Sequence, residues 1–173
     1  MSEPELRQTL LGCGTTKTRK REGEDEWVTP RAFIEALGPF DLDPCSPIPS
    51  RRPWPTAALH YTIEDDGLLQ NWRGLVWLNP PFSAVAAWVQ RLADHGSGIA
   101  LTAARTDALW FHRQVFARAK TILFYRHRIR FCHTNGEESS MTLPAPVCLF
   151  AYGDLAAQRL RDANLCGYLI ELR

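Results

Sequence analysis

The sequence predicts an α/β protein with a mostly parallel sheet and helices on both faces. Short apolar runs, such as residues 75–78 and 99–102, alternate with segments like 84–93 whose apolar residues repeat at helical spacing. Parallel strands need long crossovers, which are usually helices, so this alternation is typical of such a sheet. A length of 173 residues, with 45% apolar and 23% charged residues, fits a single soluble globular domain.

The first 25 residues differ in composition from the rest of the chain. They hold a basic run at residues 17–21, followed by an acidic stretch at 22–26. Such charge runs usually belong to solvated tails. We therefore expect a flexible N-terminal arm at 1–25 and one domain at 26–173. An arm that contacts phosphates is the alternative interpretation.

Short elements separated by prolines make up the first half of the domain. Thr29 and Pro30 suit the N-cap and first helical position of a helix that ends at Leu37, before Gly-Pro. The proline density of residues 44–58 predicts an extended loop. The other elements expected here are strands at 40–43 and 75–78, an acidic turn at 64–67 and a helix at 84–93.

In the second half of the domain, predicted strands and helices alternate more regularly. Apolar residues at helical spacing predict helices over 108–120 and 155–164. Runs of apolar, β-branched and aromatic residues predict strands at 99–102, 121–125, 147–152 and 168–172. Residues 126–143 are basic and then polar, which predicts a long loop or a hairpin.

Polar side chains stand where three of the predicted strands end. Asp43, Asn79 and Thr102 each occupy such a position. In open α/β sheets, ligands bind outside the carboxyl ends of the strands. The sequence therefore predicts that these three residues lie near one another at a binding site.

The most specific motif is Asn-Pro-Pro-Phe at residues 79–82, directly after an apolar strand. The prolines stiffen the turn, and the carbonyl oxygens of Pro80 and of the Asn79 side chain are acceptors for one NH₂ group. The ring of Phe82 offers a face for stacking a heterocycle. The motif thus indicates a pocket for a flipped-out base whose amine is methylated. An ordinary proline turn is the simpler alternative.

The order and spacing of several segments resemble the phage-type, Dam-like DNA N6-adenine methyltransferases, which are often found in prophages. The segments that carry the resemblance are Trp27–Pro30, Phe40–Ser46, Tyr61–Leu68, Trp72–Gly74, Trp77–Phe82, Ala104–Asp107, Trp110–His112 and Arg128–Phe131. The resemblance implies a Rossmann-like class I fold, S-adenosyl-L-methionine as methyl donor and adenine in double-stranded DNA as acceptor. The usual Gly-rich turn after the first strand is missing, which implies a reduced donor-binding half.

The resemblance also implies roles for individual residues. The catalytic turn is Asn79, Pro80, Pro81 and Phe82. Asp43 is the expected contact of the donor's ammonium group, and Asp66, more than Asp65, that of its adenine amine. Thr29 and Pro30 are expected over the donor's methionine end. The alternative for Asp43 is a residue that caps a loop. The alternative for Asp65 and Asp66 is a plain acidic turn, and that for Thr29 and Pro30 is a simple helix cap.

The DNA contacts must be local, because the formal net charge is only +1, from 20 Lys and Arg against 19 Asp and Glu. One basic cluster holds Arg126, Arg128 and Arg130, and a second holds Arg51 and Arg52. Arginine contacts to phosphate supply affinity, whereas base contacts supply specificity. Exposed loop charge is the alternative.

The five scattered cysteines include no CxxC pair, and neither a signal peptide nor an apolar stretch of 18 residues is present. We therefore expect reduced thiols, no metal site and a cytoplasmic location in a bacterial or phage-infected cell. No obligate protein partner is inferred. Two further classes stay open: a cytosine-N4 or protein-glutamine methyltransferase with the same motif, and a non-catalytic DNA-binding remnant.

Overall fold

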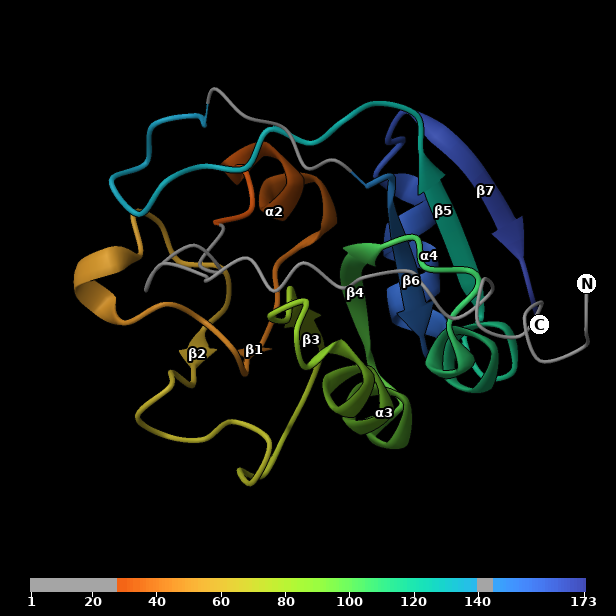
Figure 1. Ribbon diagram of the computed structural model, residues 1–173, viewed down its shortest axis with the longest axis horizontal. Coiled ribbons are helices and arrows are strands. Elements are labelled where there is room, and N and C mark those ends of the chain that lie inside the picture. The colour runs from red at the N-terminus through yellow and green to blue at the C-terminus, as the bar shows by residue number, and fades with distance from the viewer. Residues whose placement is uncertain (1–27, 140–144) are drawn as a thin grey trace, which may run out of the picture.

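A seven-stranded sheet organises the chain in a computed structural model that describes residues 28–139 and 145–173 (Figure 1). The expected arm at 1–25 lies outside the described residues. The order across the sheet is β2-β1-β3-β4-β6-β5-β7. The strands are β1 (Leu42–Asp43), β2 (Leu59–His60), β3 (Val76–Leu78), β4 (Gly98–Ala103), β5 (Thr121–Tyr125), β6 (Val147–Tyr152) and β7 (Gly167–Glu171).

The sheet is mixed, which corrects the expectation of a mostly parallel sheet. Strands β2, β1, β3 and β4 pair in parallel. In the other half, β6 pairs antiparallel with both β4 and β5, and β7 pairs antiparallel with β5. The predicted loop after β5 explains the difference, because a strand that returns without a crossover helix enters the sheet antiparallel. The parallel half is the half that carries the predicted site.

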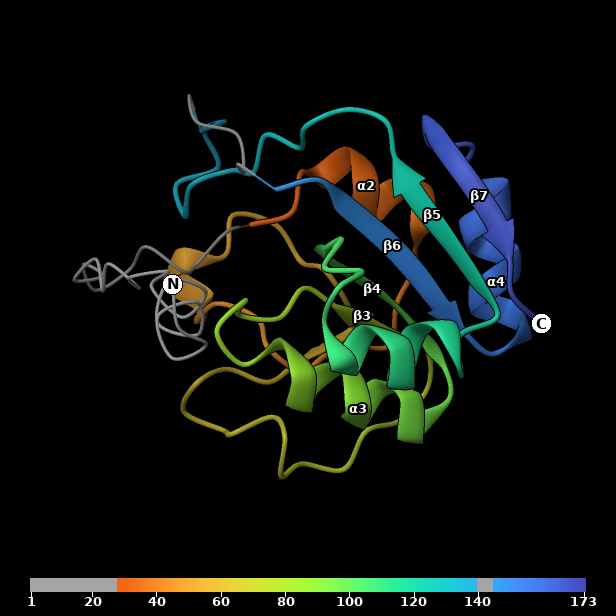
Figure 2. The same cartoon turned by 45° about the vertical axis from the view of Figure 1, so that its right-hand side comes forward.

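Helices cover both faces of the sheet, as expected. The helices α2 (Arg31–Leu37) and α4 (Asp154–Asp162) pack on one face, while α3 (Val85–His95) and the π-helix η2 (Phe111–Phe116) lie side by side on the other (Figure 2). Strand alternation divides the core accordingly. In β3, Trp77 faces the α2 side, whereas Val76 and Leu78 face the α3 side.

Two helix predictions need correction. The N-cap of α2 is Pro30 and not Thr29, and no side chain caps that helix. Thr29 is instead buried in the segment before the helix, where its backbone carbonyl accepts a hydrogen bond from Trp54 Nε1 at 3.1 Å. The predicted helix at 108–120 is largely the short η2, whose wider turn shows in the bond from Ala117 N–H to His112 O.

The segment between β1 and β3 contains no α-helix. Its elements are a 3₁₀ turn, η1 (Pro49–Arg51), and the two-residue strand β2, which the sequence analysis missed. Most parallel strands are joined by helices, so the three strands on this side of the sheet have unusually light connections. This compact segment is where the sequence indicates a reduced donor-binding half.

Candidate active site

A cavity of about 590 Å³ opens at the carboxyl ends of the parallel strands. Asp43 ends β1, and Asn79 directly follows β3. Because these strands are parallel neighbours, the two residues meet at one edge of the sheet, as predicted. The residues that line the cavity are Val28, Thr29, Asp43, Pro44, Cys45, Pro47, Arg51, Arg52, Thr56, Thr62, Ile63, Asp66, Gly67, Trp77, Asn79, Pro80, Pro81, Phe82 and Trp88.

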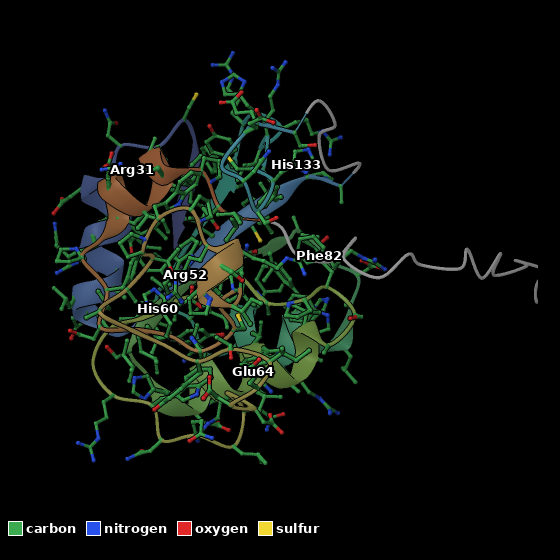
Figure 3. The ribbon with its side chains drawn as sticks, turned by 90° about the vertical axis from the view of Figure 1, so that its left-hand side faces the viewer. Arg31, Arg52, His60, Glu64, Phe82 and His133 are labelled. Carbon is green, nitrogen blue, oxygen red and sulfur yellow. The ribbon has the colours of Figure 1, made fainter. Side chains whose placement is uncertain are left out.

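Most of the residues predicted for the site lie in this one lining. It includes the whole Asn79–Phe82 turn together with Thr29, Asp43, Asp66, Arg51 and Arg52. Pro30 and Thr102 are not among the lining residues. Figure 3 looks onto this side of the molecule, with Arg52 and His60 on the left-hand segments and Phe82 on the neighbouring turn. The predicted donor and acceptor residues thus share one cavity.

The Asn79–Phe82 turn is held in place by its backbone. The Cys45 thiol donates to the backbone carbonyl of Asn79 at 3.3 Å, which ties the end of β3 to the loop after β1. Ala84 N–H donates to the carbonyl of Pro81 at 3.1 Å and closes the turn before α3. Pro80 is buried, whereas Asn79, Pro81 and Phe82 are half-buried. The turn therefore faces the cavity on a rigid frame.

Asp43 is buried and hydrogen-bonded through both carboxylate oxygens. Oδ2 accepts from the Thr56 hydroxyl, and Oδ1 accepts from Cys45 N–H at 3.2 Å. Burial raises the pKa of Asp43 to about 6, against the lowering effects of these two bonds and of Arg52. Because these bonds fix the carboxylate at the cavity wall, it can pair with a cation that enters the cavity.

The acidic turn separates the roles of its two aspartates. Asp65 Oδ2 accepts from the backbone N–H of Thr62 at 2.7 Å and from the Thr62 hydroxyl at 2.9 Å, and the backbone bond is the main cause that lowers the pKa of Asp65. Asp66 lines the cavity and has a left-handed backbone with φ of 50°. Asp65 therefore shapes the turn, and Asp66 faces the cavity.

Gly67 joins this turn to the end of β1. A Cβ at Gly67 would lie 1.9 Å from the carbonyl oxygen of Pro44, so only glycine allows the two segments to touch. We expect Gly67→Ala to push the turn away from the cavity and to cost about 1–3 kcal/mol of stability. Chemical denaturation of Gly67→Ala measures this. Gly96→Ala is the comparison for backbone strain alone, because its Cβ would meet nothing within 4 Å but its φ of 78° is left-handed, which costs about 1 kcal/mol. A loss at Gly67 no larger than the loss at Gly96 would contradict the proposed close contact.

Sequence reasoning missed several residues that build the cavity. Thr56 lines the cavity and donates to Asp43, while His60, outside the lining, accepts the backbone N–H groups of Thr56 and Ala57. They stand in a loop and in a two-residue strand, where no periodic pattern marks them. Trp88 has helical spacing typical of a core residue, and it both packs in the core and lines the cavity. The strand-end position of Asp43 was the one signal that pointed to this region.

The basic cluster of Arg126, Arg128 and Arg130 lies outside the cavity lining but at the same edge of the sheet. Arg126, Arg128 and Arg130 are exposed on the segment after β5, and β5 runs in the same direction as β4. In Figure 1 this segment arches over α2 towards η1. It reaches the cavity rim, where Val28 and Cys132 exchange backbone hydrogen bonds of 3.1 and 2.9 Å. The arginines therefore stand beside the cavity, not in it.

A mixed seven-stranded sheet with an Asn-Pro-Pro-Phe turn at a strand-end cavity fits a methyltransferase-like class of α/β protein. The family model described as DNA N-6-adenine-methyltransferase (Dam) matches residues 15–161, and the chain belongs to this family. Family membership implies an enzyme that methylates the N6 position of adenine in DNA. Comparison with curated proteins and with solved structures found no significant match.

Among residues 28–139 and 145–173, no group of three or more His, Cys, Asp or Glu side chains is arranged to hold a metal ion. No helix in the same ranges is both long and apolar enough to cross a membrane. The described cysteines Cys45, Cys132, Cys148 and Cys166 form no disulfide.

Proposed function

We propose that the chain transfers a methyl group from S-adenosyl-L-methionine to N6 of an adenine extruded from double-stranded DNA. The observation that carries the proposal is the single cavity lined by the Asn79–Phe82 turn and by two carboxylates, Asp43 and Asp66. Family membership supports adenine over cytosine or glutamine as acceptor. A Rossmann-like class I arrangement with a compact donor side agrees with the light connections between β1 and β3.

The residues fit the donor in charge and in size. A cavity of about 590 Å³ lies within the usual range of ligand pockets, about 300–1,000 Å³. Asp43 would bind the ammonium group at the buried end, and Asp66 would accept from the adenine amine at the open end. Thr29 would lie over the methionine portion. Pro30 was expected there too, but as the N-cap of α2 it is outside the lining.

The chemistry assigned to the turn is electrostatic. The donor supplies a methyl on a sulfonium sulfur, whose S–C bond breaks as the adenine N6 lone pair bonds to the methyl carbon. The Asn79 side-chain oxygen and the Pro80 carbonyl accept the two N6 hydrogens and stabilise the positive charge that develops on nitrogen. Because these acceptors are already in position, they lower the barrier to methyl transfer without having to move during the reaction. After the transfer, the extra proton leaves N6 for water.

The remaining roles concern DNA. Phe82 would stack against the extruded base, because it lines the cavity beside the acceptors. Arg51 and Arg52 at the cavity, and Arg126, Arg128 and Arg130 beside it, would contact phosphates. Restriction-modification in a prophage-bearing or phage-infected bacterium is the biological setting that we propose for such an enzyme.

Labelled methyl transfer to synthetic duplexes tests the proposed function. With duplexes of mixed sequence digested to nucleosides after the reaction, the label should appear in N6-methyladenine and not in N4-methylcytosine. Transfer that follows cytosine instead would establish an N4 enzyme. Binding of DNA without binding of the donor would establish a non-catalytic remnant, and either result refutes the proposal.

The pKa of Asp43 predicts how donor binding depends on pH. A cation binds the ionised carboxylate, so affinity should be nearly full above about pH 7 and should decrease as Asp43 takes up a proton around its pKa of about 6. With a pKa of about 6, we expect about tenfold weaker binding of S-adenosylhomocysteine at pH 5 than at pH 7.5. Calorimetry at both pH values measures this change, and Asp43→Asn should abolish it. A slope that persists in Asp43→Asn would assign the titration to another group.

Asp43 should also cost stability at neutral pH. Its pKa is about 6 in the folded chain and 3.8 ordinarily, so between these pH values the folded state binds the proton more tightly than the unfolded state. The free energy of unfolding therefore decreases as pH rises through that interval. We expect Asp43→Asn to raise the melting temperature relative to the wild type more at pH 7.5 than at pH 4. Thermal denaturation at the two pH values measures the difference, and an equal effect at both would contradict it.

A further inference from the structure

The strand β2 places His60 directly beside Asp43. In the parallel pairing of β1 with β2, Asp43 is in register with His60, and Tyr61 N–H donates to the carbonyl of Asp43 at 2.9 Å. Residues in register on neighbouring strands have side chains on the same side of the sheet. The short strand therefore places the His60 imidazole on the same side of the sheet as the Asp43 carboxylate.

The His60 ring holds the loop that carries Thr56. His60 Nε2 accepts the backbone N–H groups of Thr56 and Ala57, each at 3.2 Å. This requires a neutral ring with its proton on Nδ1. From that position Thr56, which is buried, donates its hydroxyl to Asp43 Oδ2. A continuous chain of contacts thus runs from His60 through Thr56 to Asp43.

We propose that His60 is a positioning residue, which fixes the Thr56 backbone so that the Thr56 hydroxyl is directed onto the Asp43 carboxylate. The consequence for the methyl donor rests on the proposed function, in which Asp43 binds the donor's ammonium group. The effect on Asp43 itself does not, because every hydrogen bond in the chain of contacts joins residues of the protein. The imidazole takes no part in the transfer of the methyl group or of its proton.

The charges around the two residues suit this role. Burial and, to a smaller extent, the charge of Arg52 together lower the pKa of His60 to about 4. The ring is therefore neutral and accepts hydrogen bonds above about pH 5. The titratable group that influences Asp43 is Arg52, whose charge lowers the pKa of that carboxyl. Burial and then the charge of Asp43 raise the pKa of the neighbouring Cys45 thiol. Between pH 5 and 8, Asp43 is thus the group of this chain of contacts that titrates.

A carboxyl titration without donor tests the proposal. The ¹³C signal of the Asp43 carboxyl, assigned with Asp43→Asn, reports its pKa in the intact protein. Loss of the Thr56 bond removes an interaction that lowers this pKa, so His60→Ala should raise it. Thr56→Val, which lacks only the hydroxyl, should raise it equally, and the two changes together should raise it no further. His60→Gln, which keeps an acceptor at a similar reach, should leave the value unchanged.

The opposite result is equally clear. If His60 only fills space, its removal hydrates Asp43 and the pKa falls towards the ordinary value, or it does not move; either outcome overturns the proposal. The exposed His112→Ala is the matched control and should change nothing. If His60→Ala does not fold, His60→Leu, which keeps the volume without the acceptor, decides the same question against His60→Gln.

Binding of S-adenosylhomocysteine separates this proposal from the proposed function. We expect His60→Ala and Thr56→Val to weaken binding at pH 7 about 2- to 10-fold, as for one ordinary hydrogen bond. We expect His60→Gln to restore it. If the wild type binds no donor product while the Asp43 pKa still shifts as described, the proposed function fails and the positioning role stands. If the wild type binds and His60→Ala shifts neither quantity, the positioning role fails alone.

Discussion

Asn79→Ala is expected to slow methyl transfer about 100- to 1,000-fold, the usual effect of removing one preorganised electrostatic contact. The substitution removes the side-chain acceptor but keeps the backbone carbonyl that receives the Cys45 thiol. The turn between β3 and α3 should therefore persist, and donor binding through Asp43 and Asp66 should change little, because the bond from Cys45 to the Asn79 backbone is kept. Single-turnover kinetics with saturating DNA measure the rate, and calorimetry measures donor binding.

Asn79→Asp is the matched control for this prediction. Aspartate has the same shape and offers two acceptor oxygens, so it should retain far more activity than alanine. A folded Asn79→Ala variant with near-wild-type turnover would show that Asn79 only shapes the turn. An equal loss in both variants would show that the NH₂ group of Asn79, rather than its oxygen, is required.

The second large effect is expected at Phe82. Stacking of a base on an aromatic side chain is worth about 1–3 kcal/mol, so Phe82→Ala should weaken binding of the extruded state about 5- to 150-fold. Phe82→Trp should retain activity because another flat ring can replace the first. The ring is half-buried and lines the cavity, so its loss should leave the core intact.

Pairing of the target adenine distinguishes stacking from packing. Extrusion of a mispaired base costs less, so the defect of Phe82→Ala should shrink when the target adenine is mispaired. Turnover on paired and mispaired duplexes, measured beside thermal denaturation, separates the two explanations. Unfolding of Phe82→Ala would place the ring in the core, and a folded variant with wild-type turnover on both duplexes would reject stacking.

Local chemistry made part of the site predictable from sequence. Asn79–Phe82 is a contiguous motif, and Asp43 stands at the end of a readable strand, so the strand-end rule placed both at one cavity. The strands at 121–125 and 147–152 were predicted with their exact bounds, because their apolar runs are long and clearly terminated. In these segments local pattern and global fold agree.

Nonlocal contacts explain what the sequence did not reveal. Strand β2 has two residues and exists because it pairs with β1, so no local pattern marked it or His60. Thr29 is a residue type that often caps a helix, yet here it is buried before the helix, and its backbone carbonyl accepts a hydrogen bond from Trp54. The direction of β6 depends on the space between β4 and β5 rather than on its own residues.

The most direct measurement is the content of N6-methyladenine in the DNA of cells that express this chain, determined by mass spectrometry of nucleosides. The host should lack other adenine methyltransferases, and cells expressing Asn79→Ala serve as control. We predict N6-methyladenine with the wild type, no N4-methylcytosine, and a level near background with the variant. Wild-type protein that is folded and expressed but leaves adenine unmodified, or equal modification with Asn79→Ala, would contradict the assignment of adenine methylation to this turn.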